Sequence, residues 1–370
     1  MNRWRAPLAG LIVALAAGYL CAWLRTPLPW MIGPLFAVAG ARLAGFHLVA
    51  LPGARYAGQW IIGSALGLYF TPTVVHQVAL LAPWMVVAGV YALMSGIICG
   101  IVLARLANVD LQTGFFASVP GGATEMSILA ERFGARTDLV AVAQSLRIMM
   151  VVSLIPFLYT WIDVHGADPY VQGAREFSWR GIGLLMMLTA LGGAALHRFR
   201  FPNGWVIGAL CVSLPLTAFE VNLSSVPSWV SNAGQLLIGC SLASRFKRDF
   251  LSRAPRFVSA VSVTVLLAMI LAALFGALLA WAMPAHIATM ILAMAPGGVA
   301  EMSITAKVLQ LGVPVVTAFH VARMVLLVSV TGLLYQWANN WHSARRERMS
   351  EQRKRNEEKE HREEIDDVER

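Results

Sequence analysis

Charged residues are scarce in this chain of 370 residues. Asp, Glu, Lys and Arg make up 13% of it, whereas hydrophobic residues make up 58% and the mean hydropathy is +0.64. Soluble domains carry about 25% charged residues. This composition therefore excludes an ordinary soluble domain and indicates an integral membrane protein.

The residue sets on which most enzymes depend are also missing. The cysteines Cys21, Cys99, Cys211 and Cys240 lie scattered in apolar stretches, without the spacing of a metal site or a disulfide framework. The eight histidines are dispersed, and the sequence has neither a P-loop nor a dinucleotide-binding glycine fingerprint. We therefore expect no enzymatic activity, no bound metal and no cofactor, and we interpret the cysteines as small packing residues.

Long apolar runs are abundant. The first run follows Arg3 and Arg5, as in a signal peptide, but no clean cleavage site comes after it. We interpret it as a retained helix, because a partner segment at Gly181–Leu196 takes the same place later in the chain. The runs with roughly the 17–25 residues of a membrane-spanning helix are Leu8–Leu24, Trp179–Leu196, Val258–Met283 and Thr317–Trp337.

The sequence repeats itself with an offset of about 175 residues. Order and spacing are kept, so we predict a membrane repeat at 8–161, a linker at 162–180, a second membrane repeat at 181–337 and a charged tail at 343–370. The clearest matches are LPWMIGPL (Leu28–Leu35) with NGWVIGAL (Asn203–Leu210), AGQWIIGSAL (Ala57–Leu66) with AGQLLIGCSL (Ala233–Leu242), and PGGATEMSI (Pro120–Ile128) with PGGVAEMSI (Pro296–Ile304).

The charges of the loops indicate that the two repeats are inverted. Loop Ala41–Arg55 is basic and loop Phe70–Gln77 has no formal charge. In the second half the order is reversed, since Ala218–Ser228 has no basic residue and Ser244–Arg256 has several. Basic loops are cytoplasmic as a rule, so equivalent loops lie on opposite sides. The N-terminus and the tail are then both cytoplasmic.

Inverted repeats require an odd number of crossings in each half. Four plain helices precede each PGG segment and one long helix follows it, so the PGG segment should not cross completely. We therefore predict an all-α polytopic fold with about ten spanning helices and two broken or re-entrant segments, near Pro120–Gly122 and near Pro296–Gly298.

These two PGG segments are the first candidates for a binding site. Proline breaks a helix, and broken backbone at membrane depth is tolerated only where protein or water covers it. The half-helix after each break presents free N–H groups and a positive dipole end, which attract anions. Paired broken helices form the substrate site of many secondary transporters; a kink used only for helix packing is the alternative. The residues predicted to bind substrate here are Pro120, Gly121, Gly122, Pro296, Gly297 and Gly298.

Ionisable side chains inside membrane segments point to function, because they are costly unless paired. Glu125 and Glu301 lie one turn into the half-helices, where they either carry coupling protons or cations or only cap the helix. Arg147 and Arg323 lie deep in the long helices that follow and need a carboxylate, a broken-helix carbonyl or an anionic ligand. We predict both as substrate-binding residues, with Glu125–Arg147 and Glu301–Arg323 as candidate ion pairs.

Other polar residues recur with the same offset. Gln144 and His320 precede the two arginines by one turn, and His320 is either a proton-coupling residue or a satisfied core residue. Ser127 and Ser303 are candidates for lining the site, although serines in membrane helices often bond back to their own backbone.

Gln59 and Gln235 form one more repeated polar pair, each four residues before a glycine. They either contact substrate or make hydrogen bonds across closely packed helices. The tail beyond residue 343 is of mixed charge and nearly free of apolar residues, which is typical of a solvated helix or of disorder.

The repeated motifs together resemble the AbrB family of bacterial integral membrane proteins. That resemblance implies a duplicated membrane domain in the cell inner membrane, in a group whose members are labelled transcriptional regulators or ammonia monooxygenases. No DNA-binding element is visible outside the membrane part, so any regulation would act through transport or sensing, without direct contact to nucleic acid. The motifs are the doubled PGG-x-x-E-M, GQ-x-x-[IL]-G at Gly58–Gly63 and Gly234–Gly239, and [QH]-x-x-R at Gln144–Arg147 and His320–Arg323.

We therefore expect a secondary transporter that binds a small anionic metabolite between the two broken helices at the middle of the bilayer. A membrane-embedded sensor that signals through the tail and affects gene expression is the alternative. The partners expected are a small molecule or ion and the lipid bilayer, and assembly as a homodimer stays open.

Overall fold

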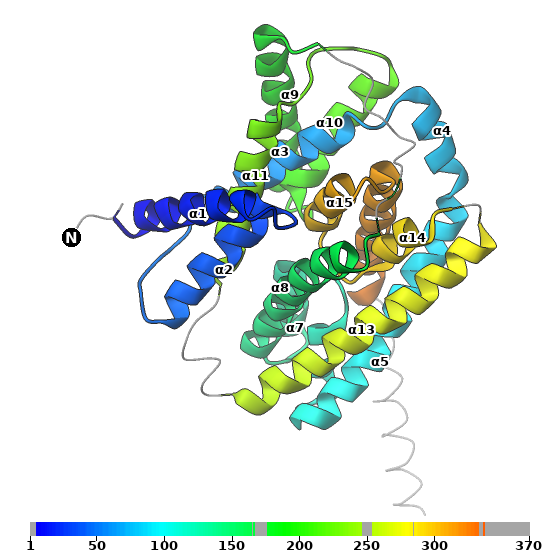
Figure 1. The fold of residues 1–370 in the computed structure, drawn as a ribbon. Helices are drawn as coiled ribbons and strands as arrows, with labels where there is room; N and C mark the ends of the chain where they lie inside the picture. Colours follow the sequence, from blue (N-terminus) through cyan, green and yellow to red (C-terminus); the bar gives the residue numbers. More distant parts are fainter. Residues whose placement is uncertain are drawn as a thin grey trace, which may run out of the picture.

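A computed structural model describes residues 5–164, 166, 176–245, 254–283, 285–332 and 336. Every regular element in these ranges is a helix, so the predicted all-α fold is confirmed for them (Figure 1). The predicted tail, most of the linker and Trp337 lie outside the described residues.

The helices of the first half are α1 (Arg5–Trp23), α2 (Pro29–Leu43), α3 (Ala54–Gly67), α4 (Pro72–Leu80), α5 (Ala82–Ala107), α6 (Leu111–Ser118), α7 (Ala123–Arg132) and α8 (Thr137–Trp161). Those of the second half are α9 (Trp179–Arg198), α10 (Gly204–Ala218), α11 (Ser228–Ala243), α13 (Pro255–Ala282), α14 (Ile287–Met294), α15 (Val299–Val308) and a final helix, Val313–Gly332.

Six of the described helices are long and apolar enough to cross a membrane: α1, α5, α8, α9, α13 and the final helix. The shorter helices α2, α3, α10 and α11 stand where the other predicted crossings lie in the sequence, and they have 14 to 16 residues. At 1.5 Å per residue they are about 21–24 Å long, shorter than the hydrocarbon core of about 30 Å. Six of the roughly ten predicted crossings therefore have this support.

The helices form two bundles, and each half of the chain contributes to both (Figure 1). In the scaffold bundle, α1 and α2 pack on α11, α3 packs between α10 and α11, and α9 packs on α10. In the core bundle, α5 packs on α6 and α13, α8 packs on α6, α7 and α13, and α13 packs on α14. The bundles meet where α3 approaches α15.

The scaffold bundle depends on direct backbone contact at glycines. A Cβ atom built on Gly208 would lie 2.2 Å from the carbonyl oxygen of Gly192, and one built on Gly63 would lie 2.4 Å from the carbonyl oxygen of Val206. Small residues at such positions let membrane helices approach closely. The GQ-x-x-[IL]-G motif thus brings α3 against α10.

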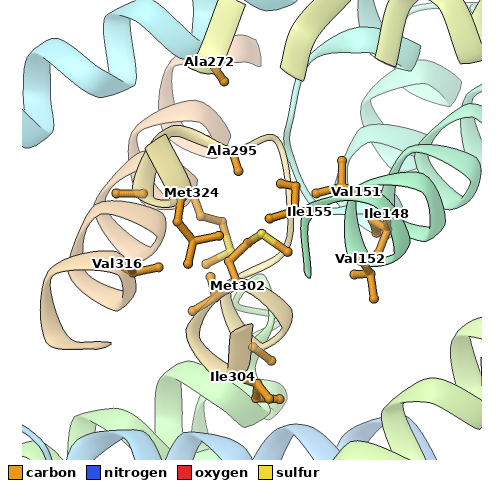
Figure 2. Packing of buried hydrophobic residues seen from close by; sticks show 14 of the residues in the cluster. Ile148, Val151, Val152, Ile155, Ala272, Ala295, Met302, Ile304, Val316 and Met324 are labelled. Atoms are coloured by element: carbon orange, nitrogen blue, oxygen red, sulfur yellow. The ribbon is translucent and has the colours of Figure 1, made fainter. Parts of the chain in front are cut away.

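The core bundle is filled by interleaved methionine and branched aliphatic side chains. Met302 of α15 lies between α8, represented by Ile155, and the final helix, represented by Met324 (Figure 2). These three side chains are 0%, 6% and 5% exposed. Tight packing of this kind holds α15 against both long helices, and it fixes the second broken segment in place.

Candidate functional site

Both PGG segments are breaks between two short helices, as predicted. The first separates α6 from α7 and the second separates α14 from α15. Gly122 and Gly298 are the N-cap residues of α7 and α15, and both have extended backbone angles. Neither N-cap supplies a side-chain hydrogen bond, so the first N–H groups of both half-helices lack a side-chain cap.

The second glycine of each motif makes room for the glutamate that follows. A Cβ atom on Gly122 would lie 1.8 Å from a carboxylate oxygen of Glu125, and one on Gly298 would lie 2.1 Å from a carboxylate oxygen of Glu301. The glutamate therefore folds back over the first turn, in the way that the third residue of a capping box does. The capping alternative matches this posture, although within the described residues neither carboxylate accepts a hydrogen bond from the N-cap backbone N–H.

The first glycine makes room for the methionine. A Cβ atom on Gly121 or on Gly297 would lie 2.5 Å from the side chain of Met126 or Met302, respectively. Both methionines are fully buried. The spacing PGG-x-x-E-M thus has a packing reason, because one glycine faces the methionine and the other faces the carboxylate.

This geometry predicts a specific effect of Gly298→Ala. The new methyl group would displace the flexible Glu301 carboxylate rather than backbone, so we expect a stability change of no more than about 1 kcal/mol. Function should fall as far as in Glu301→Ala, and the double variant should be no worse than either single variant. Thermal unfolding of the three variants, together with an assay of the transport expected from the sequence, measures this; additive losses would contradict a shared cause.

Arg147 and Arg323 bind the broken backbone. Arg147 donates to the carbonyl oxygens of Val119 and Gly121, at 3.1 and 3.2 Å. Arg323 donates to the equivalent oxygens of Ala295 and Gly297, at 2.7 and 2.9 Å. Each guanidinium therefore satisfies free carbonyl groups at the negative end of the preceding half-helix.

The predicted ion pairs Glu125–Arg147 and Glu301–Arg323 were wrong. Neither pair comes within ion-pair distance in the part of the chain that the structure describes. The reason is geometric, because each glutamate lies at the beginning of the second half-helix and each arginine binds the end of the first. The carbonyl partners considered in the sequence analysis take the place of the carboxylates.

Gln144 and His320 bind neighbouring carbonyl groups, in the half-helices α6 and α14 that precede the two breaks. Nε2 of Gln144 donates to the carbonyl oxygen of Phe116 at 2.9 Å, and Nε2 of His320 faces that of Leu292 at 3.2 Å. Nδ1 of His320 lies 2.7 Å from Arg323. A guanidinium can only donate, so Nδ1 carries no proton and the ring is neutral. His320 is therefore a satisfied core residue in this conformation.

The two breaks meet at one small cavity of about 40 Å³, called here the inner cavity. Residues from both PGG segments, the buried arginines and the scaffold bundle surround it. Its lining is Arg55, Gln59, Pro120, Gly121, Gly122, Ala123, Arg147, Ile148, Asn203, Val206, Gly297, Gly298, Val299, Ala300, Glu301, His320, Arg323 and Met324. Two uncapped half-helix N-termini from different halves of the chain therefore face the same space.

Several predicted site residues do not reach this cavity. Ser127 bonds back to the carbonyl oxygen of its own helix at 2.8 Å and lines a different cavity. Ser303 is fully buried and lies 2.8 Å from Thr317 Oγ1, because α15 is packed on the final helix. Gln144 is fully buried, Gln235 is 7% exposed, and neither lines the cavity. Pro296 is buried and does not line the cavity either.

Arg55 and Asn203 line the inner cavity but were missed as candidates. Asn203 Oδ1 accepts from Gln59 Nε2 at 3.1 Å and from Arg55 at 3.5 Å, so Gln59 does make the predicted cross-helix hydrogen bond. Asn203 Nδ2 lies 3.0 Å from Met324 Sδ and joins the scaffold bundle to the core bundle. The signal was available in the matched motifs, where Asn203 stands against Leu28.

A larger cavity of about 550 Å³, called here the vestibule, shares Arg55, Gln59 and Asn203 with the inner cavity. Glu125 lines the vestibule rather than the inner cavity, unlike Glu301. Several of its walls come from loops that the charge pattern predicts to be cytoplasmic, Ala41–Arg55 and Ser244–Arg256 among them. The residues that line it are Ala50–Leu51, Gly53–Tyr56, Gln59, Thr124–Glu125, Ile128, His197, Arg200–Phe201, Asn203–Trp205, Ser241 and Ser244–Arg245.

The two second half-helices differ in exposure although their sequences match. Ile128 of α7 is 59% exposed, whereas its equivalent Ile304 of α15 is 3% exposed. Thr124 is likewise exposed and its equivalent Ala300 is buried. The face of α7 that carries Thr124 and Ile128 is therefore exposed, and the equivalent face of α15 is buried by packing.

Comparisons with known proteins agree with this architecture. The chain is 27% identical over 375 residues to "Uncharacterized protein YhjN" of Bacillus subtilis, covering 92% of this chain and 95% of that protein. It is 25% identical over 318 residues to "Putative regulator AbrB" of Escherichia coli, covering 85% and 90%. The family model described as "Transition state regulatory protein AbrB" matches residues 30–339. The chain therefore belongs to the AbrB family.

Proposed function

We propose that this protein is a secondary transporter of a small organic anion in the cell inner membrane. The observation that carries the proposal is the pair of uncapped half-helix N-termini, from the two halves of the chain, that line one cavity. Exposed N–H groups and the helix dipole favour an anion at such a position. Broken helices that meet between repeats are the usual arrangement in carriers.

Two buried positive charges next to the cavity support an anionic substrate. Arg147 and Arg323 are each 4% exposed and interact electrostatically with one another. The Nε atom of each has no hydrogen-bond partner in the described residues. Their hydrogen-bond partners are uncharged carbonyl groups, and Arg147 also interacts electrostatically with Glu301. An anion bound between the two breaks, in a wider state of the inner cavity, would add a negative charge next to both guanidinium groups.

The unequal exposure of the half-helices supports alternating access. In this conformation α7 faces the vestibule and α15 is packed away from it. Movement of the core bundle against the scaffold bundle would break the Asn203–Met324 contact and exchange these environments. We expect the opposite state to expose Ile304 and bury Ile128.

The glutamates are the candidates for coupling. Glu301 lines the inner cavity and Glu125 lines the vestibule, and both are half-buried. Each carboxylate lies near the N-terminus where the anion would bind, so protonation of the carboxylate would lessen its repulsion of the substrate. Proton and anion would then move together. The neutral His320 holds the backbone in this scheme and does not carry the proton.

Uptake into proteoliposomes tests the proposal. Labelled acetate, benzoate, succinate and inorganic phosphate serve as probes, each with and without an inward proton gradient. Glu301→Gln, Glu125→Gln and Arg147→Gln should each lower the initial rate at least tenfold. Asp138→Asn is the matched control. It also neutralises a carboxylate, but this side chain is 63% exposed, lies on α8 and lines neither the inner cavity nor the vestibule. Unchanged rates in all three variants would reject the mechanism.

A second candidate function is a membrane sensor. It is favoured by the word "regulator" in the name of the Escherichia coli relative and by "regulatory protein" in the family description. Deletion of residues 343–370 separates the two functions. A transporter should keep its uptake rate without the tail, whereas a sensor that signals through the tail should lose its effect on gene expression.

A further inference from the structure

The vestibule carries charge of mainly one sign. Arg55, Arg200 and Arg245 line it, and Glu125 is its one carboxylate within the described residues. A cavity lined by one sign of charge concentrates ions of the opposite sign. The vestibule is therefore suited to collect anions and pass them toward the inner cavity.

Arg55 stands where the two cavities join. It lines the vestibule, the inner cavity and a small space between them that also contacts Glu301. Its one hydrogen bond in the described part of the chain, to Asn203 Oδ1, is 3.5 Å long and at the limit for such a bond. The guanidinium therefore keeps most of its donors for an oxyanion at the floor of the vestibule.

An aromatic wall stands next to this floor. The ring of Tyr56 lies 4.8 Å from that of His197 and 6.3 Å from that of Trp205, and His197 and Trp205 are 6.0 Å apart. All three residues line the vestibule, and Tyr56 is 45% exposed. Aromatic side chains bury a large apolar area and pair with other rings in offset-stacked or edge-to-face geometry.

The equivalent positions in the other half lack this chemistry. By the motif matches, Arg55 corresponds to Ser231, Tyr56 to Asn232 and Asn203 to Leu28. The backbone is alike, because Leu28 and Asn203 both have positive φ, at 50° and 48°, at the N-cap of α2 and α10. The fold therefore does not require a guanidinium, a phenol or an amide at these places.

We propose that the vestibule is a binding site for a small organic acid with a flat apolar body. Arg55 and Asn203 receive its oxyanion, a carboxylate or a phosphate, and the rings of Tyr56 and Trp205 receive its body. The sizes fit a first binding site in the vestibule, because in this conformation the inner cavity of about 40 Å³ is too small for an organic acid and the vestibule of about 550 Å³ is of ligand size. That the bound acid is also carried rests on the proposed function.

Binding to the purified full-length protein tests the site. Isothermal titration compares benzoate with acetate, and phenyl phosphate with inorganic phosphate. Each aryl probe should bind at least tenfold more tightly than its small counterpart, and the better of the two identifies the oxyanion. Arg55→Gln should weaken the better probe at least tenfold. Tyr56→Ala should remove the aryl preference and leave the small anion unaffected.

Two further variants guard the interpretation. Arg55→Lys keeps the charge but loses the bidentate geometry, so its affinity for the probe should lie between those of wild type and Arg55→Gln. Arg136→Gln, at an arginine with a side chain 61% exposed on the core bundle, should bind like wild type. The unfolding temperature without ligand shows whether each variant is folded. Equal affinities in wild type and Arg55→Gln, or no aryl preference, would overturn the site.

The site and the transporter proposal fail separately. Binding that depends on Arg55, in a protein that moves none of the probes across a membrane, keeps the site and rejects transport. Uptake that is unchanged in Arg55→Gln and in Tyr56→Ala keeps transport and rejects the site.

Discussion

Replacement of Arg323 with alanine is expected to lower the stability of the purified protein by about 3 kcal/mol or more and to abolish uptake. Arg323 donates to the carbonyl oxygens of Met294, Ala295 and Gly297, and it also contacts His320. Without it these carbonyl groups stay buried at membrane depth with no charged donor. The second break would then lose the group that holds its two half-helices in register.

Thermal unfolding in detergent measures the effect. Arg136→Ala removes a guanidinium with a side chain that is 61% exposed, and it should change the unfolding temperature by no more than 1–2 °C, as surface substitutions usually do. The unfolding temperature of Arg323→Lys should lie between those of wild type and Arg323→Ala, because an ammonium group is a single point charge and cannot bind several carbonyl groups at once. A stable, active Arg323→Ala protein would show that the broken backbone does not need this charge.

Gly208→Ala is expected to destabilise the contact between the two closely packed helices α9 and α10 of the scaffold bundle. The added Cβ would lie 2.2 Å from the carbonyl oxygen of Gly192 and 2.7 Å from Cα of Gly193. These are backbone atoms and cannot turn aside, so α9 and α10 would have to separate along their whole contact. We expect a loss of about 2–3 kcal/mol, and a larger loss for Gly208→Val.

Gly183→Ala is the matched control, since it makes the same substitution in α9 at a place where nothing lies within 4 Å of the new Cβ. It should raise stability by up to about 1 kcal/mol, because alanine is the better helix former. The two variants should therefore change the unfolding temperature in opposite directions. Equal behaviour would mean that the close contact of α9 with α10 does not hold in the membrane.

The broken segments could be predicted from the sequence because the same PGG-x-x-E-M motif occurs in both halves of the chain. One PGG inside an apolar stretch is compatible with a kink used only for helix packing. A second copy at the equivalent position, with the same glutamate, indicates a functional break in the helix. The structure places both breaks at one cavity. Composition and the long apolar runs were enough for the all-α membrane fold, because apolar runs of roughly 17–25 residues are typical of membrane-spanning helices.

The partners of the buried charges could not be predicted in the same way. A glutamate and an arginine in each repeat suggest an ion pair, but Glu125 and Arg147 serve opposite ends of one break. Which end a side chain reaches depends on how α7 and α8 fold back on each other, and sequence spacing does not contain that angle. Arg55 and Asn203 were missed for a different reason. The site candidates were residues that recur in both halves, and the positions equivalent to Arg55 and Asn203 hold Ser231 and Leu28.

The two breaks together hold two guanidinium groups and two carboxylates, so their formal charges cancel when no substrate is present. In the proposed transporter, the four charges of the two breaks would by themselves add little electrical work to a movement through the membrane field. If an anion is carried as proposed, a bound monovalent anion would add one negative charge to the same movement, which is worth about 2.3 kcal/mol per 100 mV if it crosses the whole field. A proton on Glu125 or Glu301 would restore the balance. The voltage dependence of turnover would therefore report how many protons accompany each anion.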